Sequence, residues 1–257
     1  MIGIAIVGGA GRMGQVMARG LDSLPEFDVV ALVDRSPGPA SAGASWYTTI
    51  DHVDPSRVDA VVDFSTPEGV MASARWCARH TKALVVGATG LSDADRAELV
   101  AVAEQTAVVV VSNFSIGAVL AERFAAAAAP FFDRVEIIEL HHDLKVDAPS
   151  GTSITTAHMI AQARQRAGRS TQADPTNRHT VEGSRGAVVD GVPVHAVRLP
   201  GLVAHQEVLF GAPGEGLTIR HDSYDRSSFI HGVAMVLAHL PLGPGLVEGL
   251  DRFIDGV

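Results

Sequence analysis

The sequence predicts an α/β protein in which a doubly wound parallel sheet is joined to a second, α+β region. Three observations lead to this prediction. Short apolar runs without polar alternation recur through the first half of the chain, which is typical of strands buried on both faces. Helical patterns separate the later runs, as in βαβ units with right-handed crossovers. The second half instead contains strand-like segments between turn glycines, which is typical of a mainly antiparallel sheet.

The first half of the chain contains five apolar runs that we interpret as strands. Apolar residues recur at every third or fourth position between Met13 and Leu24, directly after the first run, and this spacing predicts a helix. Helical patterns also cover residues 68–80 and 93–106. This alternation predicts the doubly wound sheet. The five runs are IGIAIVG (2–8), DVVALVD (28–34), DAVVDFS (59–65), ALVVGAT (83–89) and AVVVVSNF (107–114).

The second, α+β region begins near residue 114 and combines helices with short strands. The polar stretch 168–191 predicts a long loop, which in a compact domain is usually functional or mobile. The last apolar segment, 228–240, has helical spacing. The other expected helices cover 117–130 and 154–167, and the expected strands cover 135–142, 192–201, 205–211 and 216–223.

Composition favours a small-molecule partner. With 47% hydrophobic and 19% charged residues, the 257-residue chain is typical of a soluble protein with a large core. A formal net charge of −9 argues against nucleic-acid binding, which requires a basic surface. No apolar run approaches the ~20 residues of a membrane span, and the N-terminus lacks signal-peptide features. The single cysteine, Cys77, lies at helical spacing with Val70 and Ala74, so we expect a buried thiol and a cytoplasmic location.

The segment GGAGRMG follows the first strand and opens the first helix. Gly8, Gly11 and Gly14 permit a tight turn that leaves helix N-terminal N–H groups free for a pyrophosphate. Asp34 ends the second strand, 20 residues after Gly14, where a carboxylate accepts from ribose hydroxyls. The pattern predicts a Rossmann-type dinucleotide site, although a tight turn without a ligand is the alternative. Asp34 favours NADH, while the adjacent Arg35 keeps NADPH open.

Two further strand ends are expected at the same edge of the sheet, where open α/β sheets bind ligands. They are GATG, residues 87–90, and VSNF, residues 111–114. Asn113 fits a helix cap for the following segment as well as it fits a cofactor contact. Its position at the strand end favours the cofactor contact.

The stretch ELHHDLKVDAPSGTS, residues 139–153, gathers two histidines and a lysine before a predicted helix. His141 and His142 would point to opposite faces of a strand, and neither an HExxH spacing nor a cysteine pair is present, so we predict no metal. A histidine suits general acid chemistry, and Lys145 supplies positive charge or a proton. Gly151 and the residue after it would present free N–H groups to an anion such as a carboxylate.

The same spacing also fits an ordinary helix start. Ser150 or Thr152 would cap the helix, and the two histidines would face solvent. Residue chemistry alone leaves the capped helix and the active site open.

The stretch resembles the signature of the dihydrodipicolinate reductases, also called 4-hydroxy-tetrahydrodipicolinate reductases, in which E, any residue, HHxxK, any residue is followed by DAPSGT. The chain departs from common family patterns at Ala88, at Ser153 and at Leu144, and none of these removes a proposed catalytic group. Other segments resemble the family in the same order and cover nearly the whole chain: VGGAGRMG, VVDFSTPEGV, VVGATG, SNFSIGAVL, GLVAHQEVLFG and LTIRHDSYDRSSF.

The resemblance implies a role for each matching residue. His141 and Lys145 are the implied proton donors, and His142, Gly151 and Thr152 are the implied substrate contacts. The implied cofactor contacts are Gly8, Gly9, Ala10, Gly11, Arg12, Met13, Asp34, Gly87, Ala88, Thr89, Val111, Ser112, Asn113 and Phe114.

The resemblance also implies the reaction. A cytoplasmic homotetramer would use NADH or NADPH to reduce 4-hydroxy-tetrahydrodipicolinate to tetrahydrodipicolinate, in the diaminopimelate route to lysine. The expected domains are a dinucleotide-binding domain over 1–113, a substrate-binding and tetramerisation domain over 114–226, and a C-terminal helical segment over 227–257 that packs back on the first domain. Two alternatives are a family paralogue that reduces a related cyclic imine carboxylate and a non-catalytic NAD(P)H-sensing protein. A metal-dependent hydrolase would lack further ligands at a fixed spacing.

Overall fold

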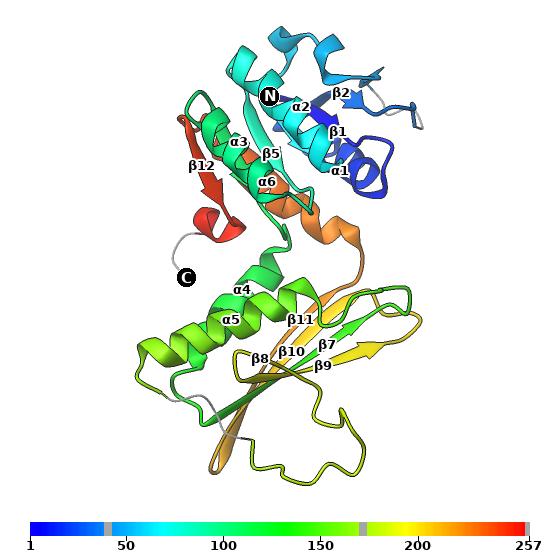
Figure 1. The fold of residues 1–257 in the computed structure, drawn as a ribbon. Coiled ribbons are helices and arrows are strands. Elements are labelled where there is room, and N and C mark those ends of the chain that lie inside the picture. Colours follow the sequence, from blue (N-terminus) through cyan, green and yellow to red (C-terminus); the bar gives the residue numbers. More distant parts are fainter. Residues whose placement is uncertain (39–42, 170–173, 255–257) are drawn as a thin grey trace. The chain divides into compact units, whose positions relative to one another are not determined.

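A computed structural model describes residues 1–38, 43–169 and 174–254. Residues 39–42, 170–173 and 255–257 lie outside the described residues. Part of the predicted loop 168–191 and the end of the predicted C-terminal segment therefore also lie outside them. The chain divides into two compact units (Figure 1). The first unit comprises Met1–Ile116 and the described C-terminal residues from Arg226, and the second unit comprises Gly117–Asp225.

The first unit is built on a seven-stranded sheet in the order β12-β6-β5-β4-β1-β2-β3. All its strand pairs are parallel, which confirms the predicted doubly wound sheet. The two edge strands, β3 and β12, were not predicted, because runs of three and four residues carry little pattern. The strands are β1 (Ile2–Val7), β2 (Phe27–Val33), β3 (Ser45–Tyr47), β4 (Ala60–Asp63), β5 (Ala83–Val86), β6 (Ala107–Val110) and β12 (Gly245–Glu248).

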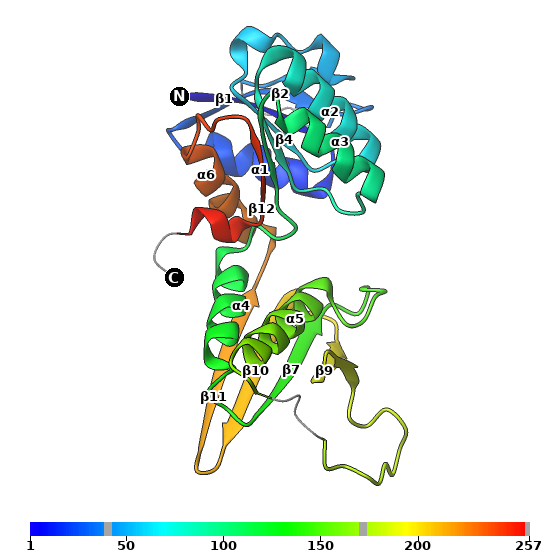
Figure 2. The ribbon, with the colours of Figure 1, turned by 60° about the vertical axis from the view of Figure 1, so that its left-hand side comes forward.

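Helices cover both faces of this sheet, as right-handed crossovers on either side of β1 require. Helices α2 and α3 lie side by side on one face, and α1 and α6 lie together on the other (Figure 2). Thr66 caps α2, and Ser92 with Asp95 forms a capping box at α3. Cys77 is fully buried in the core between α2 and the sheet. The helices are α1 (Arg12–Asp22), α2 (Pro67–His80), α3 (Asp93–Ala103) and α6 (Ile230–Ala238), and short 3₁₀ turns cover Ile50–His52, Pro55–Arg57, Arg226–Phe229 and Leu250–Phe253.

The second unit contains a five-stranded sheet in the order β11-β10-β7-β9-β8. Three pairings are antiparallel, but β7 and β9 are parallel. The parallel pair is possible because the chain leaves β7 and returns to β9 by a long crossover through α5. The elements are α4 (Ile116–Ala128), β7 (Arg134–His141), α5 (Gly151–Arg166), β8 (Ala187–Val189), β9 (Val192–Arg198), β10 (Ala204–Ala212) and β11 (Glu215–Ser223).

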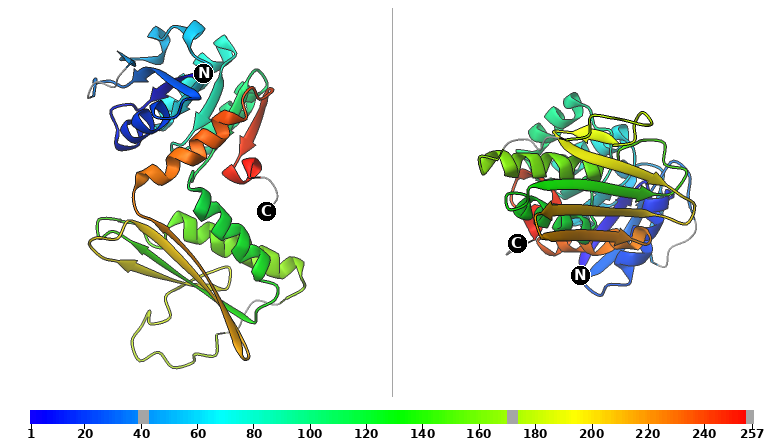
Figure 3. Two further views of the ribbon diagram at one scale, coloured as in Figure 1. Left: turned by 180° about the vertical axis from the view of Figure 1, so that it is seen from behind. Right: turned by 90° about the horizontal axis from the view of Figure 1, so that it is seen from below.

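One face of this second sheet packs against α4 and α5 and forms the core of the unit, while the other face carries neither helix (Figure 3). Alternate residues of β7 face the helices, so Val135 and Ile137 are buried. Glu139 continues the same row and is fully buried, although it is a carboxylic acid. None of the helices in the described parts of the chain is long and apolar enough to span a membrane.

Candidate functional site

The turn between β1 and α1 is held by backbone contacts. Gly8 has a φ of +80°, and its N–H and that of Gly9 both donate to the Val33 carbonyl oxygen. A Cβ on Gly14 would lie 2.2 Å from the Gly8 carbonyl oxygen, so only glycine fits there. Gly11 is the N-cap of α1 and makes no side-chain cap hydrogen bond. The first turn of α1 therefore keeps N–H groups without a side-chain cap, as an anion site requires.

A cleft of about 500 Å³ lies beside this turn in the first unit. Gly8, Gly11, Asp34 and Arg35 line it. The Asp34 carboxylate accepts a hydrogen bond from the Ala10 N–H at 3.1 Å, so it sits directly at the glycine turn. No role was predicted for the remaining polar residues of the lining, which lie in loops or on α2: Thr48, Thr49, Ser65, Thr66, Glu68 and Ser73.

The residues predicted at the next two strand ends follow β5 and β6 at the same carboxyl edge of the sheet. Gly87–Thr89 come directly after β5, and Val111–Phe114 come directly after β6. Neither group is part of the lining of the 500 Å³ cleft. The Asn113 side chain accepts a hydrogen bond from the Ser115 N–H at 2.9 Å, just before α4. Asn113 therefore makes a local contact of the kind expected for a helix cap, in a turn just ahead of α4.

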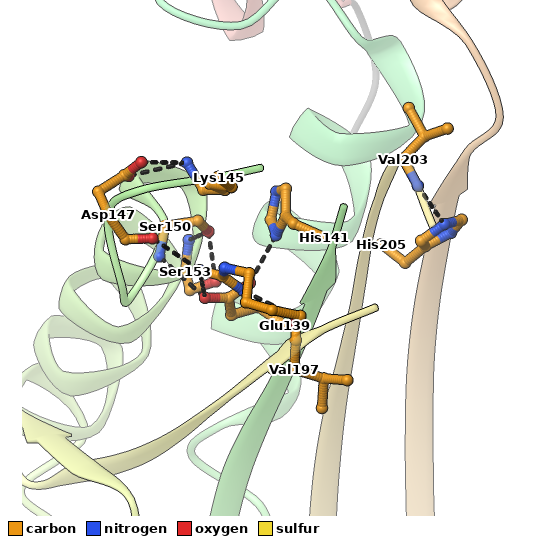
Figure 4. A network of polar contacts seen from close by, with 10 residues as sticks. Glu139, His141, Lys145, Asp147, Ser150, Ser153, Val197, Val203 and His205 are labelled. Atoms are coloured by element: carbon orange, nitrogen blue, oxygen red, sulfur yellow. Dashed lines mark hydrogen bonds and ion pairs between the residues drawn. The ribbon is translucent and has the colours of Figure 1, made fainter. Parts of the chain in front are cut away.

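In the second unit, a buried carboxylate organises the predicted proton donor (Figure 4). Glu139 Oε2 lies 2.5 Å from His141 Nδ1. Arg198, at the end of β9, donates two parallel hydrogen bonds of 2.8 Å to the two Glu139 oxygens. The Ser150 N–H donates to Glu139 Oε1 at 3.2 Å. One carboxylate thus connects β7, β9 and the start of α5.

The strand geometry explains why these groups meet. Glu139 and His141 are two residues apart on β7, so their side chains lie on the same face of the sheet. His141 is in register with Arg198 on the parallel strand β9, which brings the guanidinium to the same face. The E-x-H spacing in a predicted strand could have identified Glu139. Arg198 carries no such signal, because it lies 59 residues beyond Glu139.

Burial and the neighbouring charges shift the pKa values of Glu139 and His141 in opposing directions. Burial raises the pKa of Glu139, but hydrogen bonds from Arg198 and His141 outweigh it and hold that pKa below its usual range. Burial lowers the pKa of His141, the neighbouring Glu139 raises it, and the positive charges of Lys145 and Arg198 lower it further, so the net change is downward. Glu139 is therefore ionised, and it is the acceptor in its contact with His141.

The other predicted side chains lie in the loop between β7 and α5. Lys145 Nζ contacts both carboxylate oxygens of Asp147 at 2.8 Å. These hydrogen bonds lower the pKa of Asp147. His142 follows the end of β7, and its Nδ1 is buried without a hydrogen-bond partner in the part of the chain that the structure describes. The alternative with both histidines facing solvent does not hold, because the side chain of His141 is 15% exposed.

The start of α5 is capped by a side chain and also has open space beside it. Ser150 is the N-cap, and its Oγ accepts from the Ser153 N–H at 3.2 Å. The Ser153 hydroxyl lies 2.7 Å from the Ser150 hydroxyl, and Ser153 is fully buried. A Cβ on Gly151 would meet no atom within 4 Å, so open space lies beside the first residue of the helix. Gly151 and Thr152 stand in the first turn, where backbone N–H groups have no partner within the helix.

The residues that the structure describes contain no group of three or more His, Cys, Asp and Glu side chains that could hold a metal ion. The first unit thus contains a cleft of the kind that binds dinucleotides, and the second contains the cluster of Glu139, His141 and Arg198 beside the start of α5. A doubly wound sheet with this glycine turn and Asp34 defines a Rossmann-type oxidoreductase with a second α+β unit.

Comparison with known proteins gives the family. The family model described as dihydrodipicolinate reductase, N-terminus matches residues 2–114, and the model of its C-terminus matches residues 117–252. The chain therefore belongs to the dihydrodipicolinate reductase family. The 4-hydroxy-tetrahydrodipicolinate reductase of Streptomyces coelicolor is 45% identical over 255 residues, which cover 98% of this chain and 97% of the relative.

Two further similarities agree with this family. The 4-hydroxy-tetrahydrodipicolinate reductase of Corynebacterium diphtheriae is 44% identical, with 99% of each chain covered. The structure of dipicolinate-bound dihydrodipicolinate reductase from Paenisporosarcina sp. TG-14 superposes with a TM-score of 0.89 at 38% identity, and the match covers 99% of this chain and 100% of that chain. The family and the Rossmann-type sheet together imply a nicotinamide cofactor.

Proposed function

We propose that this chain reduces 4-hydroxy-tetrahydrodipicolinate to tetrahydrodipicolinate with NADH or NADPH, in the diaminopimelate route to lysine. The observation that carries this proposal is the cluster in which Glu139 holds His141 directly beside the open start of α5. A proton donor next to a helix N-terminus suits a substrate that carries negative charge and receives a proton in the reaction. The relatives with this reductase name support the choice of substrate.

The glycine turn and Asp34 are the residues that fit the cofactor. The first turn of α1 offers the N–H groups of Arg12 and Met13 to a pyrophosphate, and the cleft of about 500 Å³ puts Asp34 within reach of a ribose. The reduced nicotinamide supplies the hydride when it is bound. Gly87–Thr89 and Val111–Phe114 would complete the site at the same edge of the sheet.

The residues of the second unit hold the substrate and deliver a proton. His142 and the N–H groups of Gly151 and Thr152 bind substrate carboxylates, which offsets the cost of removing those charges from water. Lys145 leaves its ion pair with Asp147 and binds the substrate instead. There it supplies positive charge and acts as a second proton donor. Loss of the 4-hydroxyl group as water leaves a conjugated imine, and a proton from His141 neutralises the charge that reduction places on it.

The cleft offers one charged side chain to each form of the cofactor. Asp34 accepts from the two ribose hydroxyls of NADH, and Arg35, which lines the same cleft, pairs with the 2′-phosphate of NADPH. Replacing Asp34 with Ala is expected to weaken NADH more than NADPH, and Arg35→Ala is expected to do the opposite. Equal losses for both cofactors in each variant would contradict these roles.

The homotetramer that the family resemblance implies needs an interface, and the face of the second sheet that lacks α4 and α5 offers one. It presents the half-buried side chains of Ile138, Leu140, Val197 and Leu209. Light scattering of the purified protein is expected to give four chains, and Leu209→Arg is expected to reduce that number. The single, buried Cys77 suits a reducing cytoplasm.

The experiment that tests the reaction measures oxidation of NADH and NADPH with freshly generated 4-hydroxy-tetrahydrodipicolinate. The wild type is expected to turn over, and His141→Ala and Lys145→Ala are each expected to lower kcat about 100-fold or more. Binding of the cofactor is measured separately and is expected to be unchanged. A wild type that binds the cofactor but leaves this substrate untouched would overturn the proposal and favour a paralogue or a sensor.

A further inference from the structure

We propose that Glu139 is a positioning residue: together with Arg198 it keeps a proton on His141 Nδ1, so that the proton delivered to the substrate leaves from Nε2. This inference rests on the proposed role of His141. It gives a function to Glu139 and Arg198, for which the sequence alone predicts none.

The four contacts of Glu139 fix its state. Its two oxygens accept from the two nitrogens of the Arg198 fork, from Ser150 N–H and from His141 Nδ1. The carboxylate is fully buried, and a buried charge of this kind is tolerated only when it is paired and hydrogen-bonded. Every other partner is a donor, so Glu139 is an acceptor on all sides and His141 Nδ1 must carry a proton.

The tautomer of His141 follows from this contact. With Nδ1 protonated, the neutral ring has its lone pair on Nε2, and the imidazolium has its transferable proton on Nε2. When the substrate takes that proton, the ring returns to the neutral Nδ1–H form and its bond to Glu139 is unchanged. Glu139 neither gains nor loses a proton, and water restores the proton on Nε2.

The charges around His141 come from three elements. Glu139 on β7 favours the imidazolium, while Arg198 on β9 and Lys145 in the following loop oppose it. Asp147 pairs with Lys145, and its backbone carbonyl oxygen accepts from Arg198 at 2.7 Å. Glu139 is thus the acidic group in direct contact with a ring that two cations would otherwise keep neutral.

The chain contains a matched control for this cluster. Glu136, on the same strand but on the opposite face, also pairs with an arginine and a histidine, Arg185 and His195. This second cluster is not adjacent to the start of α5. Glu136→Gln therefore removes a carboxylate of the same type from the same strand without touching His141, and because Glu136 lies on the face proposed as the interface between chains, light scattering checks that its oligomeric state is that of the wild type.

Glu139→Gln keeps the shape of the side chain but places an amide NH₂ against N–H donors. The conflict is relieved when His141 Nδ1 loses its proton and accepts from the amide, which moves the proton of the neutral ring to Nε2. In this tautomer Nε2–H is a very weak acid. We expect kcat to fall about 100-fold or more while KM changes less than about threefold, because the anion cradle remains. Glu136→Gln is expected to change kcat less than about threefold.

Two readouts separate positioning from a general structural role. Nitrogen-15 NMR of the histidine side chains is expected to show His141 protonated at Nδ1 in the wild type and at Nε2 in Glu139→Gln. In kinetics, the double variant Glu139→Gln with His141→Ala is expected to be no slower than His141→Ala alone, because Glu139 acts through His141. A full additional loss in the double variant, or an unchanged tautomer, would overturn the inference.

The outcomes also distinguish this inference from the proposed function. A fully active His141→Ala would contradict the role of His141 in the reaction. A fully active Glu139→Gln beside an inactive His141→Ala would contradict the positioning role alone. Thermal unfolding of each variant checks the fold. Where Glu139→Gln does not fold, Arg198→Lys keeps the charge but loses the two-pronged contact, and it is expected to lower kcat about tenfold with the same lack of additivity.

Discussion

The two units build their candidate sites from different parts of the chain. In the first unit the glycine turn is made of backbone: its conformation is set by Gly8 and by close approach at Gly14. In the second unit the site is made of side chains, and a buried carboxylate connects three separate elements. A backbone site tolerates almost no added atom, whereas a side-chain site depends on charge and on the position of a proton. Substitutions that add a methyl group should therefore affect the two units differently.

The largest expected effect is that of Gly14→Ala. The new Cβ would lie 2.2 Å from the backbone oxygen of Gly8, which cannot move without opening the turn. We expect the free energy of unfolding to fall by about 2 to 3 kcal/mol and cofactor binding to be lost. Denaturant unfolding and cofactor titration measure the two effects.

Gly20→Ala is the control for this substitution, because it lies on the same helix and its Cβ would also come within 2.2 Å of an atom, here in the Ile230 side chain instead of the backbone. The Ile230 side chain has to shift, but no backbone atom does, and alanine favours the helix by about 1 kcal/mol, so the loss should be smaller than at Gly14. Equal losses in the two variants would show that the backbone contact at Gly14 has no special role.

The second expected effect is that of Gly151→Ala, which tests the open start of α5. The added Cβ meets no protein atom within 4 Å, so the fold should be unchanged or slightly more stable. If a substrate carboxylate occupies that space, KM should rise about tenfold. Steady-state kinetics and thermal unfolding are compared with Gly243→Ala, which also faces open space but lies away from both candidate sites. An unchanged KM would place the carboxylate elsewhere.

The third expected effect concerns pH. Burial and the nearby Lys145 and Arg198 hold the pKa of His141 below 6.5 in the free protein, although Glu139 opposes them. If protonated His141 is the acid, kcat/KM falls as pH rises through this lowered pKa. The negative charges of a bound dicarboxylate raise the pKa of His141, so kcat should fall at a higher pH than kcat/KM does. Profiles of both constants test this, and a kcat/KM that rises over the same range would show that neutral His141 is the working form.

The fold was predictable where a pattern is long and local. The strands β1, β2, β4, β5 and β6 and the helices between them follow from apolar periodicity, and the glycine turn follows from its position between a strand and a helix. The edge strand β12 was missed because four residues at the end of the chain carry no period. In the second unit, the parallel pairing of β7 with β9 depends on a crossover that sequence spacing does not reveal.

The candidate site was predictable where residues are neighbours in sequence. His141, Lys145 and Gly151 stand in one stretch, but the partner that orients His141 was passed over because a glutamate in a strand usually faces solvent. Glu139 is instead buried, since Arg198 reaches it from another strand. The cleft lining from Thr48 and Ser65 was missed for the same reason, because contact between loops depends on the finished fold.

The smallest expected effect is that of Ser153→Ala, which tests whether the departure at this position matters. The Ser153 hydroxyl is buried and lies 2.7 Å from the Ser150 hydroxyl, whose oxygen also accepts from the Ser153 N–H. Alanine removes the hydroxyl–hydroxyl contact but leaves the backbone N–H and the N-cap in place. We expect the free energy of unfolding to fall by about 1 kcal/mol or less, with kcat and KM unchanged. Ser150→Ala, which removes the cap itself, should cost about twice as much. A kinetic defect in Ser153→Ala that matches the one in Gly151→Ala would show that the hydroxyl contacts the substrate rather than the helix cap.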